Sequence, residues 1–378
     1  MAEFKKVLFE QMIKDFALNE VAPLAADVDE KEMFPRETVD KMAKLGLLGI
    51  IIPKQYGGAG ATYNEYIFAV EELSKYCGTT GVILSAHTSL CAAPILEYGT
   101  EEQKQKYLPD LASGAKLGAF GLTEPNAGTD ASNQQTVAVE KEDHYLLNGT
   151  KIFITNAGEA ETYVIIAVTG QGPKGPEMTA FIVEKAFEGF SFGKHEKKMG
   201  IRGSATRELI FENVKVPKEN MLGKRGEGFK IAMKTLDGGR IGIAAQALGI
   251  AEGAFETTVN YVKSRKQFNR PISAFQNTQF ALADMATKVA AAKGLVYAAV
   301  NAKINKLPTL SVNAAQAKLF AAETAMDVTT KAVQLHGGYG YTREYPVERM
   351  MRDAKITEIY EGTSEVQRMV ISGALLKK

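Results

Sequence analysis

The sequence has almost no net charge and no long apolar run, and each shortage excludes a class of protein. Lys and Arg number 45 against 44 Asp and Glu. Proteins that bind nucleic acid or anionic membranes need a positive field, so this balance predicts no nucleic-acid partner. No stretch reaches the ~20 consecutive apolar residues that span a bilayer, so we expect no membrane insertion.

Cysteine is equally scarce. Cys77 and Cys91 are the only two, and their spacing matches neither a disulfide framework nor a metal or redox pair. A reducing compartment is therefore expected. The first six residues, Met1 to Lys6, have no apolar signal core and no Arg- and Ser-rich transit pattern. We expect a cytoplasmic protein, most simply in a bacterial cytosol, although a mature protein of an organelle matrix has the same features.

Several catalytic signatures are missing. The four histidines lie far apart, without the spacing of metal ligands, and there is no Gly-x-Ser-x-Gly elbow or Gly-Lys-Ser/Thr loop. We therefore expect no metal site. The segment Gly170 to Gly175 matches a dinucleotide fingerprint letter by letter, but a strand pattern follows it. Without a helix N-terminus to hold a pyrophosphate, the segment predicts a hairpin loop.

The 378 residues are enough for two or three domains, and the spacing of their apolar residues changes twice along the chain. Residues 1–115 have helical periodicity interrupted by Pro and Gly. Residues 116–226 contain short period-two runs, with Asn148-Gly149 as a hairpin signal, which predicts an antiparallel β-barrel or sandwich. Residues 227–378 return to helical periodicity and predict a four-helix-type bundle. The fold class is α+β multidomain.

Two helices of the predicted bundle matter below. The first runs from about Phe229 to Ser264, on the order of 50 Å at ~1.5 Å per residue. The third shows an apolar stripe that we place on Leu319, Ala322, Met326 and Val333.

Four segments offer polar groups beside glycine or aromatic residues: 120–130, 151–156, 334–340 and 359–365. Taken singly, each has an ordinary structural use. The first is a surface turn, Phe153 packs in a core, Gly337 and Gly338 end a helix, and Thr363 or Ser364 caps the next one. Their combination and order carry more information than any one of them.

In that order the sequence resembles the acyl-CoA dehydrogenase family over nearly its whole length. The resemblance rests on Thr-Glu-Pro-x-Ala-Gly-Thr-Asp at 123–130, Phe-Ile-Thr-Asn at 153–156, Arg-x-x-Phe at 265–268, Gln-x-x-Gly-Gly at 334–338 and Ile-Tyr-Glu-Gly-Thr at 359–363. Two positions depart from the usual pattern. Asn126 stands where glycine is frequent, and Phe153 stands where tryptophan is most common.

The resemblance implies FAD bound between the β domain and the bundle of a homotetramer, a dimer of dimers. Thr123 and Thr155 are expected to bond the flavin ring with Phe153 beside it. Arg265 and Gln276 are expected to bind from one subunit, and Gln334 to Gly338 from a neighbour. The full cofactor set is Phe120, Leu122, Thr123, Thr129, Phe153, Ile154, Thr155, Arg265, Phe268, Gln276, Gln334, Leu335, His336, Gly337, Gly338, Thr363, Ser364 and Glu365. Arg265 has a second structural use, because it complements the C-terminal end of its own helix.

Glu361 resembles the family's catalytic base, which removes the α-proton of an acyl-CoA thioester while the β-hydride leaves to flavin N5. A carboxyl group titrates near 4.3 in water, so burial must raise its pKa. Glu358 and Glu365 are the nearest rivals. A minority of the family carries the base on the first bundle helix, where this chain has Gly239. The substrate set implied by the resemblance is Thr129, Asp237, Gly238, Gly239, Arg240 and Gly362.

Among subfamilies the likeness is greatest to short-chain, butyryl-CoA-type enzymes, and it rests on residues 81–89 and 236–240. It implies interconversion of butyryl-CoA and crotonyl-CoA, with electrons exchanged with an electron-transferring flavoprotein. Two alternatives remain open. An acyl-CoA oxidase would pass electrons to oxygen and form peroxide without a partner. A non-catalytic relative would bind FAD or CoA without turnover.

Overall fold

The computed structural model describes residues 2–172 and 175–376, and its first part is helical. Capping boxes begin two of its helices. Thr62 Oγ1 accepts from Asn64 N at 3.2 Å while Thr62 N donates to Glu65 at 2.9 Å, and Thr100 and Gln103 repeat the arrangement. The elements are α1 (Ala2–Phe16), η1 (Ala17–Val21), η2 (Ala22–Leu24), α2 (Ala25–Glu30), α3 (Arg36–Lys44), η3 (Lys54–Tyr56), α4 (Tyr63–Tyr76), α5 (Gly78–Ser85), η4 (Ala86–Ala92), α6 (Ala93–Tyr98) and α7 (Glu101–Ser113).

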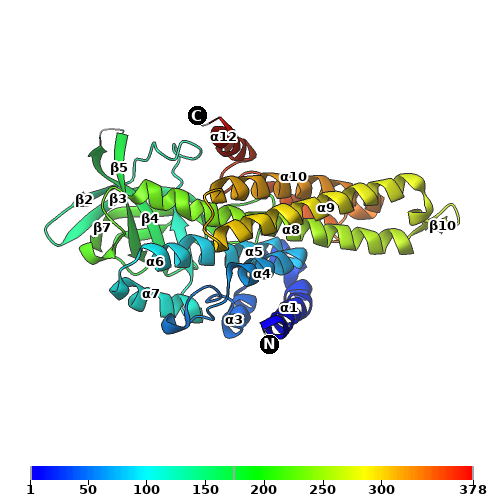
Figure 1. Cartoon of the computed structure of the whole chain (residues 1–378), viewed down its shortest axis with the longest axis horizontal. Coiled ribbons are helices and arrows are strands. Elements are labelled where there is room, and N and C mark those ends of the chain that lie inside the picture. The colour runs from blue at the N-terminus through cyan, green and yellow to red at the C-terminus, as the bar shows by residue number, and fades with distance from the viewer. Residues whose placement is uncertain (1, 173–174, 377–378) are drawn as a thin grey trace.

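The segment Gly78–Tyr98 is a continuous helical run of 21 residues with mean hydropathy 1.3. By length and composition alone it could span a membrane, contrary to the expectation that no stretch is long and apolar enough. Yet 89% of its most apolar window is buried inside the protein. Its first part, α5, lies between α8 and α4 in the middle of the molecule (Figure 1), so we assign it as a core helix.

The middle part is a mainly antiparallel sheet with strand order β6-β7-β3-β2-β4-β5-β8, and β1 pairs with β4. The pairings β1–β4 and β2–β4 are parallel, so the predicted purely antiparallel pattern is wrong at these two places. The strands are β1 (Gly118–Gly121), β2 (Val137–Glu140), β3 (His144–Thr155), β4 (Thr162–Gly172), β5 (Gly175–Glu184), β6 (Phe190–Phe192), β7 (Thr206–Pro217) and β8 (Met221–Leu222), with η5 (Lys218–Asn220) before β8.

Two turn predictions in the sheet have opposite outcomes. Asn148 and Gly149 form no hairpin: they lie inside β3, at a register shift against β7 between Leu147 and Gly149. Gly149 has φ of +145°, a backbone conformation that favours glycine. Glycine is therefore needed here for the register shift within the strand and not for a turn. The hairpin predicted at Gly170 to Gly175 is confirmed, because β4 and β5 are antiparallel and Gly172 pairs with Gly175. The two residues at its tip lie outside the described residues.

The last part is a bundle of long helices that crosses the whole molecule (Figure 1). It contains α8 (Gly228–Ser264), β9 (Lys266–Gln267), β10 (Arg270–Pro271), η6 (Ile272–Ala274), α9 (Gln276–Ile304), α10 (Leu310–His336), η7 (Gly337–Tyr341), α11 (Val347–Thr357) and α12 (Ser364–Leu375). The predicted first helix is confirmed to within one residue. The fold class is also confirmed: helices, then a sheet, then a helical bundle.

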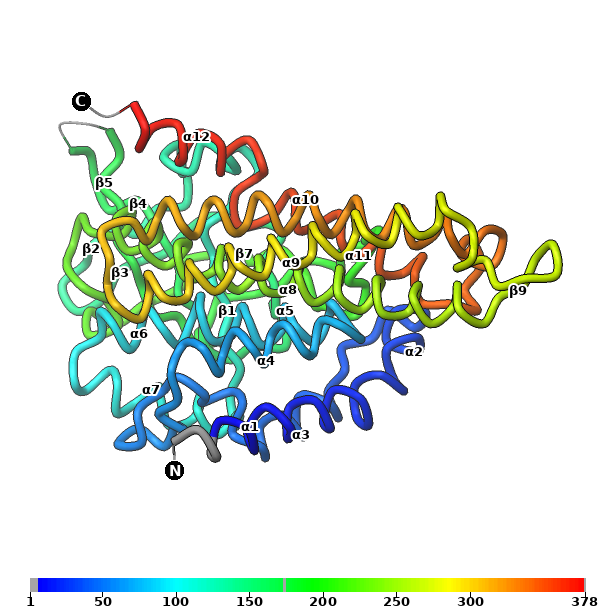
Figure 2. The backbone as a smooth tube through the Cα atoms, turned by 45° about the vertical axis from the view of Figure 1, so that its right-hand side comes forward, coloured from blue at the N-terminus to red at the C-terminus, as the bar shows by residue number. Residues whose placement is uncertain are grey.

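The long helices fix where the ends of the molecule lie. The start of α8 is anchored to the sheet, because Gly226 N donates to Thr179 Oγ1 at 3.1 Å. Its far end leads to β9 and β10, which project from the opposite end of the molecule in both views (Figures 1 and 2). The N-terminal helices run beneath α8 and α9, and α12 lies above α10 (Figure 2). The sheet and the far end of the bundle are therefore widely separated within one chain.

Candidate active site

Glu361 lies in the short turn between α11 and α12. Its φ is +51°, and the following Gly362 has φ of +94°. A non-glycine residue in the left-handed region costs about 1 kcal/mol or more, so the surrounding structure must hold it there. This turn directs the side chain of Glu361 back toward α8 and η4.

The carboxylate of Glu361 is closely packed against α8 and η4. Its Oε2 atom is shielded from solvent and has no hydrogen-bond partner among the described residues. A Cβ atom added to Gly239 of α8 would overlap this Oε2 and lie 2.8 Å from Leu90 Cδ2. Burial raises the pKa of Glu361 to about 7, against the opposing charges of Lys318 and Arg240. An unpaired carboxylate that titrates near neutrality is suited to accept a proton.

Side chains fix the segment of α8 that faces Glu361. Arg240 pairs with Asp237 at 3.0 Å, and Ser311 donates its hydroxyl to the other oxygen of Asp237 at 2.6 Å. The hydroxyl of Tyr63 donates to the carbonyl of Gly238 at 3.0 Å. The predicted substrate residues Asp237, Gly238, Gly239 and Arg240 are thus brought together beside Glu361 and Gly362, whereas Thr129 lies in the exposed loop after β1.

Near the start of α8, the sheet brings together the ring-binding part of the predicted cofactor set. Ile152 N donates to Thr123 O at 2.9 Å, so the end of β1 and the end of β3 lie side by side. Phe153 has φ of +57° and is 62% exposed, whereas Ile154 beside it is buried. The period-two alternation expected within residues 116–226 is broken here by a second register shift against β7, between Lys151 and Ile154. An exposed aromatic ring and two threonine hydroxyls in these neighbouring segments offer one surface for stacking and donors for hydrogen bonds to a planar ligand.

Another part of the predicted set, Arg265, Phe268, Gln276 and residues 334–338, lies at the far end of the bundle, whereas Thr363, Ser364 and Glu365 directly follow the turn of Glu361. Arg265, which follows α8, lies over the ring of Tyr339 at 5.3 Å, and Tyr261 donates its hydroxyl to His336 O at 3.2 Å. Phe268 is 87% exposed on the β9–β10 hairpin. A Cβ atom at Gly337 or Gly338 would meet nothing within 4 Å, so this backbone is open to close approach. Gln276 and Gln334 are exposed near it, and Leu335 is half-buried.

These two groups lie far apart within one chain. From Gly239, beside Glu361, to Arg265 the helix rises about 39 Å, at ~1.5 Å per residue. Arg265 and Gln334, which are expected to bind FAD from different subunits, lie at one end of the same chain. The predicted cofactor residues are therefore divided between the sheet and the far end of the bundle.

Comparisons with known proteins agree with this arrangement over the whole chain. Residues 5–115, 119–214 and 226–376 match the N-terminal, middle and C-terminal domains of acyl-CoA dehydrogenase. A short-chain specific acyl-CoA dehydrogenase of Clostridium acetobutylicum is 64% identical over 372 residues, covering 98% of this chain and 97% of that protein. The chain belongs to the acyl-CoA dehydrogenase family.

Two solved structures show the same likeness. Butyryl-CoA dehydrogenase from Megasphaera elsdenii has a TM-score of 0.95 and 54% identity, over 98% of this chain and 97% of that one. A chain from work on the electron-transferring flavoprotein of Acidaminococcus fermentans and flavin-based electron bifurcation has a TM-score of 0.95 and 59% identity, over 98% of both chains. This acyl-CoA dehydrogenase is thus an FAD-dependent oxidoreductase.

Sequence reasoning missed two buried lysines in the dehydrogenase. Lys151 is fully buried and donates to Glu124 at 2.7 Å, to Gln134 at 2.9 Å and to Leu122 O at 3.1 Å. It thereby holds the loop that carries Thr123. Lys318 of α10 is also fully buried and donates to Gly362 O at 2.6 Å. The sequence offered only a weak signal for them: each is a lysine within a predicted strand or helix, and a lysine there normally faces solvent.

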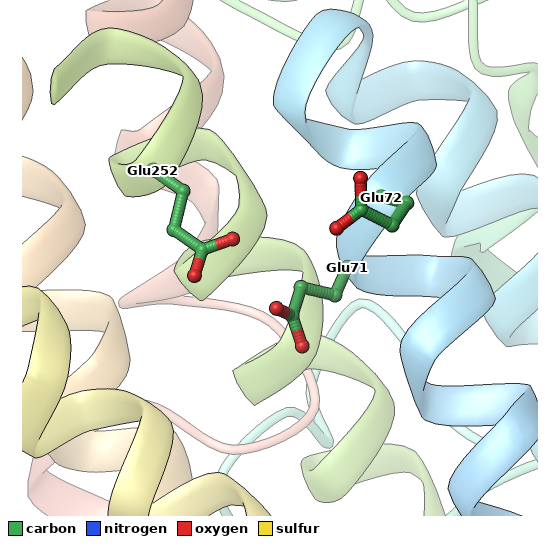
Figure 3. Close-up of side chains that lie close together, drawn as sticks. All are labelled: Glu71, Glu72 and Glu252. Carbon is green, nitrogen blue, oxygen red and sulfur yellow. The ribbon is translucent and has the colours of Figure 1, made fainter. Parts of the chain in front are cut away.

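A cluster of acids outside this site has a structural role. Glu71 and Glu72 of α4 face Glu252 of α8, with ligand atoms within 4.8 Å of one another (Figure 3). Lys293 binds Glu71 at 2.7 Å and Glu252 at 3.0 Å, and Lys75 binds Glu72 at 2.9 Å and Glu252 at 3.1 Å. Each of the three carboxylates is thus paired with an ammonium group, and the cluster joins α4, α8 and α9 by ion pairs.

Proposed function

We propose that the protein interconverts short-chain saturated and α,β-unsaturated acyl-CoA thioesters, with butyryl-CoA and crotonyl-CoA as the pair, and that Glu361 is the base. The observation that supports this most strongly is the unpaired, shielded Oε2 of Glu361 against the bare backbone of Gly239. The residues 1–115, 116–226 and 227–378 are the three structural units that we assign to it.

Glu361 performs the proton transfer in this proposal. Its carboxylate takes the α-proton of the thioester, and a pKa near 7 gives both enough ionised base and enough basicity at neutral pH. General-base catalysis of this kind contributes about 10²–10⁴-fold. The neighbouring rivals fit less well: Glu358 pairs with Lys355 at 2.6 Å, and Glu365 is exposed.

FAD supplies the acceptor for the β-hydride when it is bound. In our assignment, Phe120, Leu122, Thr123, Thr129, Phe153, Ile154 and Thr155 hold its ring side, together with Thr363, Ser364 and Glu365 beside the base. Arg265, Phe268, Gln276 and Gln334 to Gly338 of a second subunit hold its other end. Arg265 provides the planar, always charged donor that a diphosphate favours. The proposal therefore includes a homo-oligomer, a dimer of dimers.

Substrate length, partner and compartment follow from different observations. The 54–64% identity to short-chain specific and butyryl-CoA relatives supports a short acyl chain. Similarity to short-chain and electron-bifurcating relatives supports an electron-transferring flavoprotein as the redox partner. Both cysteines are free and buried, which fits a reducing bacterial cytoplasm.

Chain length is tested by titrating the FAD-loaded protein anaerobically with butyryl-CoA and, separately, with octanoyl-CoA. We expect butyryl-CoA to bleach the visible flavin band and octanoyl-CoA to bleach it far less. Comparable bleaching by both thioesters would contradict the short-chain assignment while leaving the dehydrogenase reaction intact. Rapid peroxide formation in air without a partner protein would instead favour an oxidase.

A further inference from the structure

The turn that carries Glu361 is held by two side chains that meet at one atom. Lys318 Nζ donates to the carbonyl oxygen of Gly362 at 2.6 Å. Gln367 Nε2 donates to the same oxygen at 2.7 Å and lies 3.5 Å from the carbonyl oxygen of Glu361. Lys318 comes from α10 and Gln367 from α12, so the left-handed turn is fixed from both of its sides.

The two donors differ in charge. Gln367 is neutral, whereas Lys318 is an ammonium group that is fully buried and has no ion pair among the described residues. An unpaired buried ammonium is costly unless nearby charge compensates for it. Burial lowers the pKa of Lys318 to about 8, and Glu361 is the leading group that raises it again.

Other charged groups around the base are already engaged or exposed. Arg240 of α8 is paired with Asp237, Glu358 with Lys355, and Glu365 is solvent-exposed. The remaining titratable groups that face Glu361 are the phenols of Tyr63 and Tyr66 from α4 and of Tyr360 beside it, whose pKa values burial raises. They are neutral at physiological pH. Lys318 is thus the cation beside Glu361 that has no ion pair among the described residues, and its charge acts on Glu361 together with that of Arg240.

We propose that Lys318 is a positioning residue for Glu361: it holds the left-handed turn through the Gly362 carbonyl, and its charge favours the ionised form of the carboxylate. The inference rests on the proposed role of Glu361 as the base. The hydrogen bond and the charge of Lys318 can be tested separately, because Gln367 donates to the same Gly362 oxygen but is neutral.

The test compares the pH dependence of kcat in Lys318→Met, Lys318→Gln and Gln367→Met. An opposite charge nearby lowers a carboxyl pKa, so its loss raises the pH at which the base ionises. We expect the lower midpoint of the kcat profile to move up by on the order of one pH unit in both Lys318 variants. In Gln367→Met, kcat falls while the midpoint stays in place. In all three, KM changes less than kcat.

Controls separate the role of Lys318 from folding and from the proposed base. Lys331→Met removes a partly exposed lysine of the same helix, paired with Asp327 at 3.0 Å, and leaves the profile unchanged. FAD content per chain is measured for every variant. An unshifted midpoint in both Lys318 variants, while Glu361→Gln is inactive, would overturn the role of Lys318 alone. An active Glu361→Gln would overturn the base itself. Lys318→Gln, which retains a donor, serves if Lys318→Met does not fold.

Discussion

At the scale of the residue, the environment that makes Glu361 a base also makes its charge unfavourable for folding. Its pKa in the folded protein is about 7, above the ordinary value of 4.5. Folding therefore favours the protonated form. The corresponding stability is fully present below pH 4.5 and is lost as the pH rises through about 7, because an ionised carboxylate must then be buried.

Glu361→Gln is neutral at every pH and escapes this loss. We expect the variant to be more stable than the wild type at pH 8, by at most about 3 kcal/mol, with the difference shrinking toward pH 5. Urea unfolding of both FAD-loaded proteins at pH 5, 6, 7 and 8 measures it. A difference that does not vary with pH would show that the carboxyl group is not perturbed in the fold.

Residue identities could be predicted here only where a motif carried them. Glu361 came from the resemblance, and the pKa shift that its role requires followed from general chemistry. Lys318 was missed because the apolar stripe of its helix was placed on Leu319. The structure buries Ala322 of that stripe but leaves Leu319 half-buried, and it buries Lys318 together with Ala314, Ala321, Ala325 and Val328. Because the predicted buried face of the helix was rotated by about one residue, Lys318 was expected at the surface.

At the scale of the element, α8 takes part in the site through a residue without a side chain, Gly239. Glycine costs about 1 kcal/mol relative to alanine inside a helix, so Gly239 lowers the propensity of α8. It leaves room for the carboxylate of Glu361, which would overlap a Cβ atom there. The helix and its length were predictable from periodicity, whereas the partner that approaches Gly239 comes from a distant turn.

Gly239→Ala separates helix propensity from the space beside the base. We expect turnover to fall by at least tenfold, because the added methyl displaces Glu361, while FAD content and helicity stay near the wild type. Gly294→Ala on α9 is the matched control: a Cβ atom there meets nothing within 4 Å, so activity stays unchanged and stability rises slightly. Full activity of Gly239→Ala would show that Glu361 does not occupy this space during catalysis.

At the scale of the whole molecule, the predicted cofactor residues divide between its two ends. The order of the three structural regions was predictable from the change in hydrophobic period. The position of Arg265 relative to Gln334 was not, because it depends on how α8 and α10 pack side by side over their full length. Residues far apart in sequence, such as Arg265 and Gln334, therefore lie at the same end of the chain, although they were expected to bind FAD from different subunits.

Hybrid oligomers test a site that is shared between subunits. Glu361→Gln and Arg265→Ala chains, with different tags, are expressed together, and the mixed oligomers are purified on both tags. If each site takes its base from one chain and Arg265 from another, a hybrid pair contains one intact site and regains activity. Mixing the two purified parent proteins after assembly is the control. Hybrids as inactive as both parents would place each site within one chain.

The most direct test of the central claim adds Glu361→Gln to the anaerobic titration with butyryl-CoA. We predict that butyryl-CoA rapidly bleaches the flavin of the wild type. In the FAD-loaded variant the thioester should still bind and perturb the flavin spectrum, but bleaching should be slower by about 10²-fold or more, since the general base is gone. Bleaching of the variant at the wild-type rate would contradict the assignment of Glu361 as the group that removes the α-proton.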